Sequence, residues 1–239
     1  MCRMIAAPLG LSGRLLIDPF LRMAQGLKML NERNTEFGKI THGDGWGAVY
    51  EDDGRMKPLR GLRPCWDDPA IKTLLDKSVI LLHARRKSAG SVVLEDTHPF
   101  EREIAGARWF FCHNGTVRDP LPDPLTPTEG STDSERLFGL LQPYIDEDDV
   151  LAGLHAVYGR IHAFTSLNSF LLGPDDLWAV CLHTENPDYY TLTLAETDDG
   201  PIVSSEPLDE FAGEQTTILN GTVLWIDRWS GAIEMYTLD

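Results

Sequence analysis

The sequence is poor in cysteine and in basic residues. Its 239 residues include four cysteines, and 21 Lys and Arg stand against 37 Asp and Glu, which gives a formal net charge of −16. Four scattered cysteines without a CxxC pair argue against a disulfide framework at this chain length and favour a reducing compartment. The sequence also lacks a Lys/Arg cluster, which a protein needs to neutralise nucleic-acid phosphates or an anionic membrane surface. We therefore expect no nucleic-acid partner and no membrane association.

Long apolar runs are missing as well. No segment approaches the length of a transmembrane helix, and the first residues lack the apolar core of a signal peptide. We expect a cytoplasmic protein for this reason. The chain has neither internal repeats nor a long low-complexity linker, and the proline-rich segment 120–130 is expected to be a loop. We therefore expect one domain over residues 1–239.

The pattern of apolar residues predicts an α+β fold. Helices are expected at 17–31, 132–145 and 146–161, the second of them opened by a capping box in which Glu135 follows Thr132 by three residues. Residues 46–61 predict a hairpin with a DDG turn. Many short apolar runs follow residue 168, including YYTLTLAE, and these predict antiparallel strands. Packed sheets covered by helices are the expected architecture.

Cys2 directly follows the initiator methionine. Cysteine is small enough for an aminopeptidase to remove Met1, after which one residue would carry both a thiol and a free α-amine. A thiol has a reference pKa of about 8.5 and an α-amine one of about 7.7–8.0, so the amine can accept the thiol proton. Cys2 is therefore a candidate nucleophile with a base of its own, although cysteine also occurs at position 2 by chance.

The stretch FFCHNGTV places Asn114 and Gly115 at the end of an apolar run. An asparagine amide and a glycine backbone N–H are two donors that an acyl-transfer site can direct at a developing oxyanion. Asn-Gly is also the commonest hairpin turn, which is the ordinary interpretation. The pair is therefore a candidate oxyanion hole.

Charged residues that suit an amino-acid substrate follow two other elements. Arg85 comes after the strand-like run SVILLHA, where its guanidinium can bind a carboxylate and Ser88 can add a hydrogen bond to the same anion. Asp133 lies in the first turn of a predicted helix, where it either complements the helix dipole or binds an ammonium group. In one pocket, Arg85 and Asp133 would hold a zwitterionic amino acid, and glutamine has a side-chain carbonyl that a thiol can attack.

Together these stretches resemble the class II glutamine amidotransferases, which are N-terminal-nucleophile hydrolases. The matching pieces are, in order, MCR, THGDGWGAVY, LLHARRKSAGSVVLEDTHPF, FCHNGTV, STDSERLF, NSFLLG and VSSEPL. The resemblance covers nearly the whole chain and is greatest to stand-alone members, some of which act on γ-glutamyl compounds. It implies a four-layer αββα sandwich of two antiparallel sheets between helical layers.

The resemblance also implies roles for individual residues and no metal or organic cofactor. Cys2 would be the nucleophile and its α-amine the base. The other implied roles are an oxyanion hole (Asn114 and Gly115), carboxylate binding (Arg85), ammonium binding (Asp133), support near Cys2 (His42 and the GDGWG loop) and lining or support of the site (His98). Synthase-linked members have Trp-Ala-Thr-His after the arginine, where this chain has Arg86-Lys87-Ser88-Ala89. The details of the pocket are therefore expected to differ.

The expected activity is hydrolysis of glutamine or of a γ-glutamyl amide through a thioester on Cys2. Use of the released ammonia in a synthesis would require a separate ammonia-accepting enzyme. Two alternatives remain open, namely an N-terminal cysteine hydrolase of another amide class and a non-catalytic amino-acid-binding domain. A metal protein is disfavoured because the histidines lack HxxxH or HExxH spacing and because Cys112 and His113 point to opposite sides of one strand.

Overall fold

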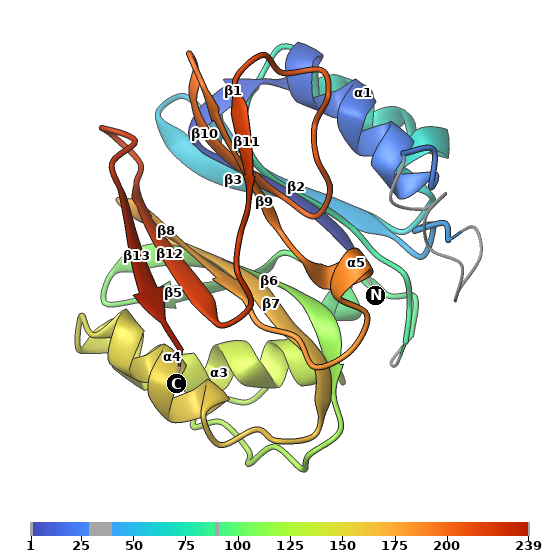
Figure 1. Cartoon of the computed structure of the whole chain (residues 1–239). Coiled ribbons are helices and arrows are strands. Elements are labelled where there is room, and N and C mark those ends of the chain that lie inside the picture. The colour runs from blue at the N-terminus through green and yellow to red at the C-terminus, as the bar shows by residue number, and fades with distance from the viewer. Residues whose placement is uncertain (1, 29–39, 89–90, 239) are drawn as a thin grey trace.

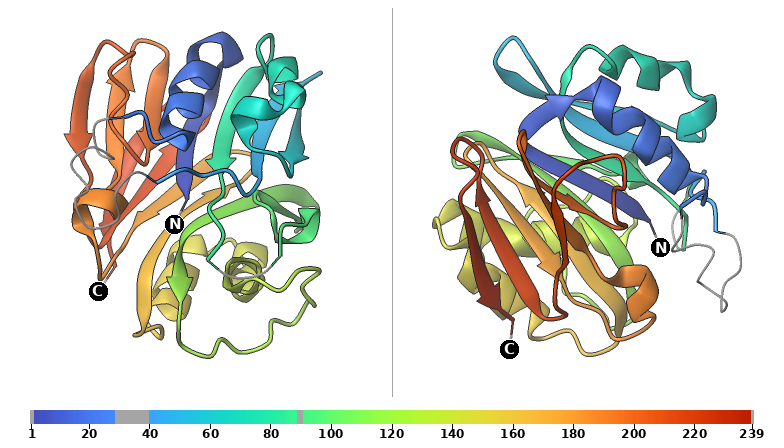
Figure 2. Two further views of the ribbon diagram at one scale, coloured as in Figure 1. Left: turned by 90° about the vertical axis from the view of Figure 1, so that its right-hand side faces the viewer. Right: turned by 45° about the horizontal axis from the view of Figure 1, so that its top comes forward.

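The computed structural model describes residues 2–28, 40–88 and 91–238. Two antiparallel sheets are stacked, and helices cover their outer faces (Figures 1 and 2). The four layers, helix, sheet, sheet and helix, confirm the predicted αββα sandwich. Within the described part of the chain, no helix is long and apolar enough to cross a membrane.

The first sheet has β1 at its centre. Its strands are, in spatial order, β11 (Glu214–Thr217), β9 (Thr193–Thr197), β10 (Gly200–Ser204), β1 (Arg3–Ser12), β4 (Ser78–Ala84), β2 (Trp46–Asp52) and β3 (Arg55–Gly61). The first six residues of β1 are all buried because helices cover one face of this sheet and the second sheet covers the other. A strand covered on both faces has a near-continuous apolar sequence, as β1 has.

The second sheet contains the strand with the Asn-Gly pair, and its outer face is covered by two helices. Its strands are, in spatial order, β13 (Ile233–Thr237), β12 (Thr222–Asp227), β8 (Asp176–Cys181), β7 (Phe164–Leu172), β6 (Ala107–Val117) and β5 (Phe100–Ile104). The α-helices are α1 (Gly13–Ala24), α3 (Asp133–Asp146), α4 (Val150–Tyr158) and the short α5 (Pro187–Tyr190), and the 3₁₀ helices are η1 (Cys65–Asp67), η2 (Pro69–Leu74) and η3 (Leu94–Asp96).

Three apolar layers hold these elements together. One lies between α1 and the first sheet, the second between the two sheets, and the third between the second sheet and helices α3 and α4. The helix α1 contributes Leu16, Phe20 and Met23, which are buried and spaced three or four residues apart. Burial of each such side chain contributes about 1.5–3 kcal/mol. The middle layer decides where the site lies, because β1, β4 and β6 all face it.

The first predicted helix begins and ends earlier than expected. It was expected at 17–31, but α1 covers 13–24, and residues 29–31 lie outside the described residues. Gly26 has φ +66° and donates to Met23 O, while Leu27 donates to Arg22 O. These two hydrogen bonds form a Schellman motif, which ends the helix. At its start, Gly13 packs so closely on Leu74 that a Cβ would lie 2.0 Å from the Leu74 carbonyl oxygen.

The predicted hairpin is confirmed. β2 pairs with β3, and Asp53 and Gly54 between them have φ of 54° and 69°, as a type I′ turn requires. The helix start at Thr132 is also confirmed, since Thr132 accepts a hydrogen bond from Glu135 N. The carboxylate of Glu135, however, accepts from Glu129 N and Gly130 N rather than from Thr132 N, so the capping box is incomplete.

One predicted strand is partly wrong. Tyr189 and Tyr190 belong to α5, because Pro187 starts a short helix there and β9 begins only at Thr193.

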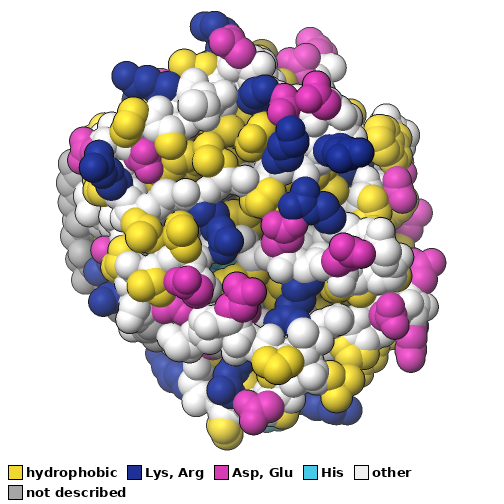
Figure 3. Space-filling view, turned by 180° about the vertical axis from the view of Figure 1, so that it is seen from behind, with side chains coloured by type: hydrophobic (Ala, Val, Ile, Leu, Met, Phe, Trp, Pro, Cys, Tyr) yellow, Lys and Arg dark blue, Asp and Glu magenta, His cyan; other side chains and the backbone are white. Residues whose placement is uncertain are grey.

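On the face seen in Figure 3, basic and acidic side chains are interspersed with apolar ones. Neither charge sign forms a continuous patch on this face.

Candidate active site

Cys2 and Asn114 meet where the two sheets approach each other. On β1, Met4 and Ala6 belong to the apolar layer between the sheets, and strand alternation places Cys2 on the same side. Cys112 of β6 belongs to that layer too, so Asn114 also faces inward. Cys2 is 6% exposed and Asn114 is fully buried. Cys2, directly before β1, and Asn114, near the end of β6, thus meet although they are distant in the sequence.

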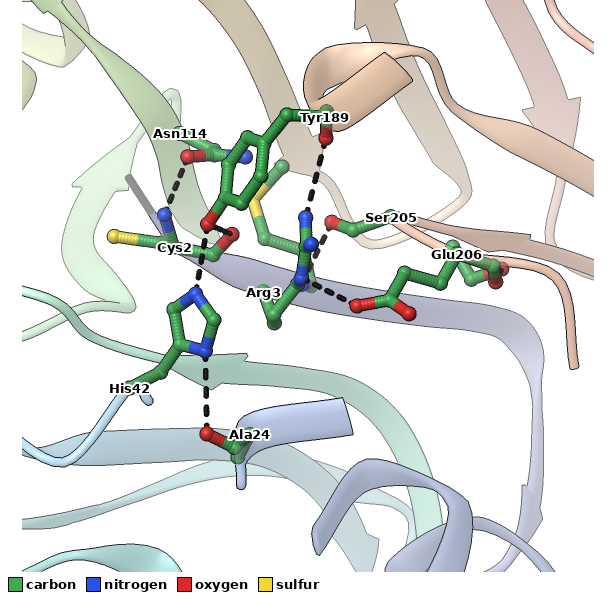
Figure 4. A network of polar contacts seen from close by, with 10 residues as sticks. Cys2, Arg3, Ala24, His42, Asn114, Tyr189, Ser205 and Glu206 are labelled. Atoms are coloured by element: carbon green, nitrogen blue, oxygen red, sulfur yellow. Dashed lines mark hydrogen bonds and ion pairs between the residues drawn. The ribbon is translucent and has the colours of Figure 1, made fainter. Parts of the chain in front are cut away.

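Asn114 contacts the backbone nitrogen of Cys2. The Cys2 nitrogen donates to Asn114 Oδ1 at 2.5 Å (Figure 4). The amide nitrogen Nδ2 of Asn114 is buried and has no hydrogen-bond partner among the described residues. Buried donors are nearly always paired, so an unpaired donor on the side chain that contacts Cys2 is a candidate for binding a developing oxyanion.

Gly115 is needed for a close backbone approach. A Cβ at this position would lie 1.7 Å from the carbonyl oxygen of Ser166 on β7. The same carbonyl accepts from Nε2 of His113 at 3.0 Å, and Nδ1 of His113 lies 2.9 Å from Ser134 Oγ on α3. Residue 115 must therefore be glycine for β6 to keep its position between β7 and α3.

The thiol of Cys2 is acidic for a buried cysteine. Burial raises its pKa, but the positive charge of the amino terminus and the imidazole of His83 lower it, with the result that the pKa is about 6. His83 lies on β4 as the Cα partner of Met4. The thiol is also 4.0 Å from the carbonyl oxygen of Arg86. A thiol with this pKa is largely a thiolate at neutral pH, which is the reactive form.

Two buried histidines lie together beside the thiol. The rings of His83 and His98 have centroids 4.2 Å apart; the nitrogens of His98 have no hydrogen-bond partner among the described residues, whereas His83 interacts with the Cys2 thiol. Burial, followed by the charge of His83, lowers the pKa of His98 well below its usual value, so His98 is neutral. The structure therefore places His98 next to His83 at the site, on the inner side of the sheet.

His42 reaches Cys2 through Tyr189 (Figure 4). Burial and the charge of Arg3 are the main causes of a His42 pKa well below the usual value, so the ring is neutral. Nδ1 lies 3.2 Å from Ala24 O and must carry the proton, which leaves Nε2 to accept from the Tyr189 hydroxyl at 2.7 Å. The Tyr189 oxygen lies 3.5 Å from the carbonyl oxygen of Cys2.

A buried ion pair holds the other side of Tyr189. Arg3 Nε lies 2.6 Å from Glu206 Oε1, and both side chains are almost completely buried. The guanidinium of Arg3 stacks on the Tyr189 ring at 3.9 Å and donates to the Tyr189 carbonyl at 3.1 Å. Ser205, next to Glu206, accepts from Met4 N at 2.9 Å. The VSSEPL stretch thereby anchors the strand that carries Cys2.

Arg85 lies on the side of the site that faces the η3 segment. It is 4% exposed, and its Nη1 donates to the carbonyl of Ser91 at 2.7 Å. Asp96 accepts from the backbone nitrogens of Ser91 and Ser131. Burial raises the pKa of Asp96, but these hydrogen bonds and the charge of Arg85 lower it below its usual value. Arg85 is thus held in a polar network that includes a carboxylate.

Ser88 and Asp133 both lie near the end of β6. Thr116 Oγ1 donates to Ser88 Oγ at 3.2 Å, and Val117 N donates to Asp133 Oδ2 at 2.7 Å. Asp133 Oδ1 accepts from Ser134 N in the first turn of α3. Asp133 therefore ties the start of α3 to β6 and presents a half-buried carboxylate beside the segment that carries Ser88.

Of the predicted residues, Asn114 contacts Cys2 directly and His42 reaches it through Tyr189, whereas Ser88 and Asp133 contact residues at the end of β6. Sequence reasoning missed His83, Arg3, Tyr189, Glu206 and Arg86. The strand alternation that places Leu81 between the sheets could have indicated His83, whereas the contacts of Tyr189 and Glu206 join segments that no local pattern connects. Within residues 2–28, 40–88 and 91–238, no three His, Cys, Asp or Glu side chains are grouped so that they could hold a metal ion.

Known proteins resemble this chain in sequence and in fold. Residues 9–186 match the family model described as "Glutamine amidotransferases class-II". YafJ of Escherichia coli, named as a candidate glutamine amidotransferase, is 33% identical over 107 residues, and the match covers 42% of this chain and 42% of YafJ. The gamma-glutamyl-hercynylcysteine sulfoxide hydrolase of Mycolicibacterium smegmatis is 28% identical over 222 residues, which cover 89% of this chain and 90% of that protein.

The fold has solved counterparts. The glutamine phosphoribosylpyrophosphate amidotransferase of B. subtilis superposes with a TM-score of 0.66 at 12% identity, over the whole of this chain and 49% of that one. At that identity the similarity concerns the fold alone. The family match covers most of this chain and includes the strands that position Asn114, Gly115 and Arg85. This chain belongs to the class II glutamine amidotransferase family.

Proposed function

We propose that this chain hydrolyses γ-glutamyl amides, glutamine included, through a thioester on Cys2 after removal of Met1. The observation that carries the proposal is the position of Asn114. Its Oδ1 holds the backbone nitrogen of Cys2 at 2.5 Å, while its buried Nδ2 has no partner among the described residues. One side chain can therefore orient the α-amine and also donate to an oxyanion.

The first half of the reaction forms the thioester. The α-amine of Cys2 accepts the thiol proton, and the thiolate attacks the γ-carbonyl carbon. The carbonyl oxygen becomes an oxyanion, to which Asn114 Nδ2 and the backbone N–H of Gly115 donate. The α-ammonium then gives its proton to the departing amine as the C–N bond breaks, which releases ammonia or a larger amine.

The second half regenerates the enzyme. The α-amine takes a proton from water, the resulting hydroxide attacks the thioester, and the same two donors stabilise the second oxyanion. Collapse of this intermediate breaks the C–S bond and releases glutamate, and the α-ammonium returns its proton to the departing Cys2 thiolate. In this proposal Arg85 and Ser88 bind the α-carboxylate of the substrate and Asp133 binds its α-ammonium, while His98 lines the substrate site and His42 supports it.

The M. smegmatis relative supports an amide larger than glutamine. Its name states that it hydrolyses a γ-glutamyl compound, and the match covers nearly the full length of both chains. The match with YafJ covers less than half of YafJ, so a role as an ammonia donor receives less support from it.

Intact mass spectrometry with a diazo-ketone glutamine analogue tests the proposal. The expected result is a protein without Met1 that gains one adduct, which peptide mapping assigns to Cys2 and excess glutamine prevents. The Cys2→Ala variant is the matched control and should gain none. If Cys2→Ala hydrolyses γ-glutamyl amides as fast as the unmodified chain, the proposed mechanism is wrong.

A further inference from the structure

The start of β1 is paired differently on its two sides. Pairing with β4 begins at Arg3, whereas pairing with β10 begins only at Ile5. Two hydrogen bonds between Ser205 and Met4 extend the contact with the β10 side by one residue. The peptide that joins Cys2 to Arg3 therefore lies beyond the pairing with β10.

The short helix α5 contacts this peptide through Tyr189 (Figure 4). The hydroxyl oxygen of Tyr189 lies 3.5 Å from the carbonyl oxygen of Cys2. The guanidinium of Arg3 lies over the Tyr189 ring, 3.9 Å from its centroid, and donates to the Tyr189 carbonyl at 3.1 Å. One residue of α5 thus contacts both residues of the Cys2–Arg3 peptide.

Tyr189 is itself fixed in place. Its hydroxyl donates to His42 Nε2 at 2.7 Å, and the other ring nitrogen of His42 lies 3.2 Å from Ala24 O at the end of α1. The Tyr189 ring is buried and packs with Ile40 and Tyr190 in a small apolar cluster. The hydroxyl therefore stands at the end of a series of contacts that begins on α1.

Asn168 attaches α5 to the second sheet. It is fully buried on β7, where it is the Cα partner of Asn114. Its Nδ2 donates to the carbonyl of Tyr190, and its Oδ1 accepts from Leu182 N at 2.8 Å. The candidate oxyanion donor and the helix that contacts Cys2 are therefore fixed to the same pair of strands.

We propose that Tyr189 is a positioning residue, which holds the Cys2–Arg3 peptide so that the thiol and the α-amine are aligned with Asn114. After removal of Met1, Cys2 is a chain end with a single peptide bond, so contacts of this kind decide its orientation. A displacement of about 1 Å from the productive geometry can lower the rate about 10²-fold. This inference rests on the proposed function and adds to it a residue that acts through the backbone of Cys2.

Two variants of Tyr189 test the inference. Tyr189→Phe keeps the ring over Arg3 but removes the bond to His42 and the oxygen beside the Cys2 carbonyl. It should lower kcat for γ-glutamyl amide hydrolysis about tenfold, and Tyr189→Leu, which also removes the ring, about 10²-fold. KM should change little, because the groups proposed to bind the substrate are retained.

Alkylation by iodoacetamide separates positioning from a loss of folded protein. The reagent requires the thiolate but no alignment with Asn114. Both variants retain the amino terminus and His83, which lower the pKa of the Cys2 thiol, so the alkylation rate at pH 7 should equal that of the unmodified chain. The amplitude of this fast reaction counts the folded chains, and kcat is expressed per folded chain.

Tyr158→Phe is the matched control. The Tyr158 hydroxyl is buried and lies 2.8 Å from Ser169 Oγ, but Tyr158 belongs to α4, in the apolar layer outside the second sheet. This variant loses a comparable hydrogen bond and should keep its kcat.

Two results would overturn the inference while the proposed function stands. One is an unchanged kcat in both Tyr189 variants, and the other is an equal loss of kcat in Tyr158→Phe. If the unmodified chain hydrolyses no γ-glutamyl amide, the proposed function fails and the inference fails with it.

Discussion

The side chain of Asn114 and the backbone nitrogen of Cys2 are 2.5 Å apart, although 112 residues separate them in the sequence. This contact joins the first sheet to the second. It also holds the amide while Nδ2, which is buried and unpaired within the described residues, remains available as a donor. One hydrogen bond thus links the proposed base and the proposed oxyanion donor.

Replacement of Asn114 by Asp should separate acid–base chemistry from oxyanion binding. The carboxylate can still accept from the Cys2 nitrogen, but it has no N–H to donate. Loss of one oxyanion donor typically lowers kcat by about 10²–10³-fold. We expect a loss of that size in amide hydrolysis, with alkylation of Cys2 retained. A variant that hydrolyses amides at the original rate would show that Asn114 donates nothing to the reaction.

Cys2 should be the one cysteine that reacts quickly at pH 7. Its pKa is about 6, whereas burial is the main cause that raises the pKa of Cys65 to about 12 and of Cys181 to about 11, and burial also raises that of Cys112. Only Cys2 is therefore a thiolate at this pH. Brief treatment with iodoacetamide followed by peptide mapping should find a single modified residue. Labelling of Cys65 at a comparable rate would contradict the assignment.

Replacement of His83 by Gln should shift the reactivity of Cys2 to higher pH. The His83 imidazole lowers the thiol pKa, so its removal raises that pKa and leaves less thiolate in weakly acidic solution. At pH 6 the alkylation rate should fall on the order of threefold or more, while the rate at high pH stays the same. His155→Gln on α4 is the matched control. Identical pH profiles for the His83 variant and the unmodified chain would exclude this role.

Gly115→Ala should disrupt both activity and stability. The new Cβ would lie 1.7 Å from Ser166 O, which belongs to a neighbouring strand and cannot move alone. Gly106→Ala is the comparison, because Gly106 has φ +77° and no atom within 4 Å of an added Cβ, so it loses only about 1–2 kcal/mol through backbone strain. Urea unfolding and amide hydrolysis should both distinguish the two variants. Equal losses would mean that the close approach at Gly115 is unimportant.

The Arg3–Glu206 pair should contribute strongly to stability only as a pair. Removal of one partner from a buried ion pair leaves the other charge uncompensated and typically costs about 3–5 kcal/mol. Arg3→Met alone should therefore destabilise the chain by that amount in urea unfolding. The double variant Arg3→Met with Glu206→Met should recover much of the loss. A double variant with simply additive losses would argue against a coupled pair.

The sequence by itself determined the layers and much of the candidate site. Strand alternation, the DDG turn and the helix start at Thr132 depend on neighbours within a few residues, so local patterns predict them. Cys2, Asn114, Gly115, Arg85 and Asp133 follow from the order of the motifs. The end of α1 was predicted too late, although Gly26 carried the signal for it.

Only the tertiary structure decided how these segments meet. His83 acts on Cys2 because β4 pairs with β1, and Tyr189 stands beside His42 because α5 returns to the start of β1. Glu206 neutralises the buried charge of Arg3, although some two hundred residues separate them in the sequence. The carbonyl of Arg86 lies beside the thiol because its neighbours are hydrogen-bonded to Asp44 and Gly45. Contacts of this kind are set by the packing of whole sheets, for which a single sequence contains no local pattern.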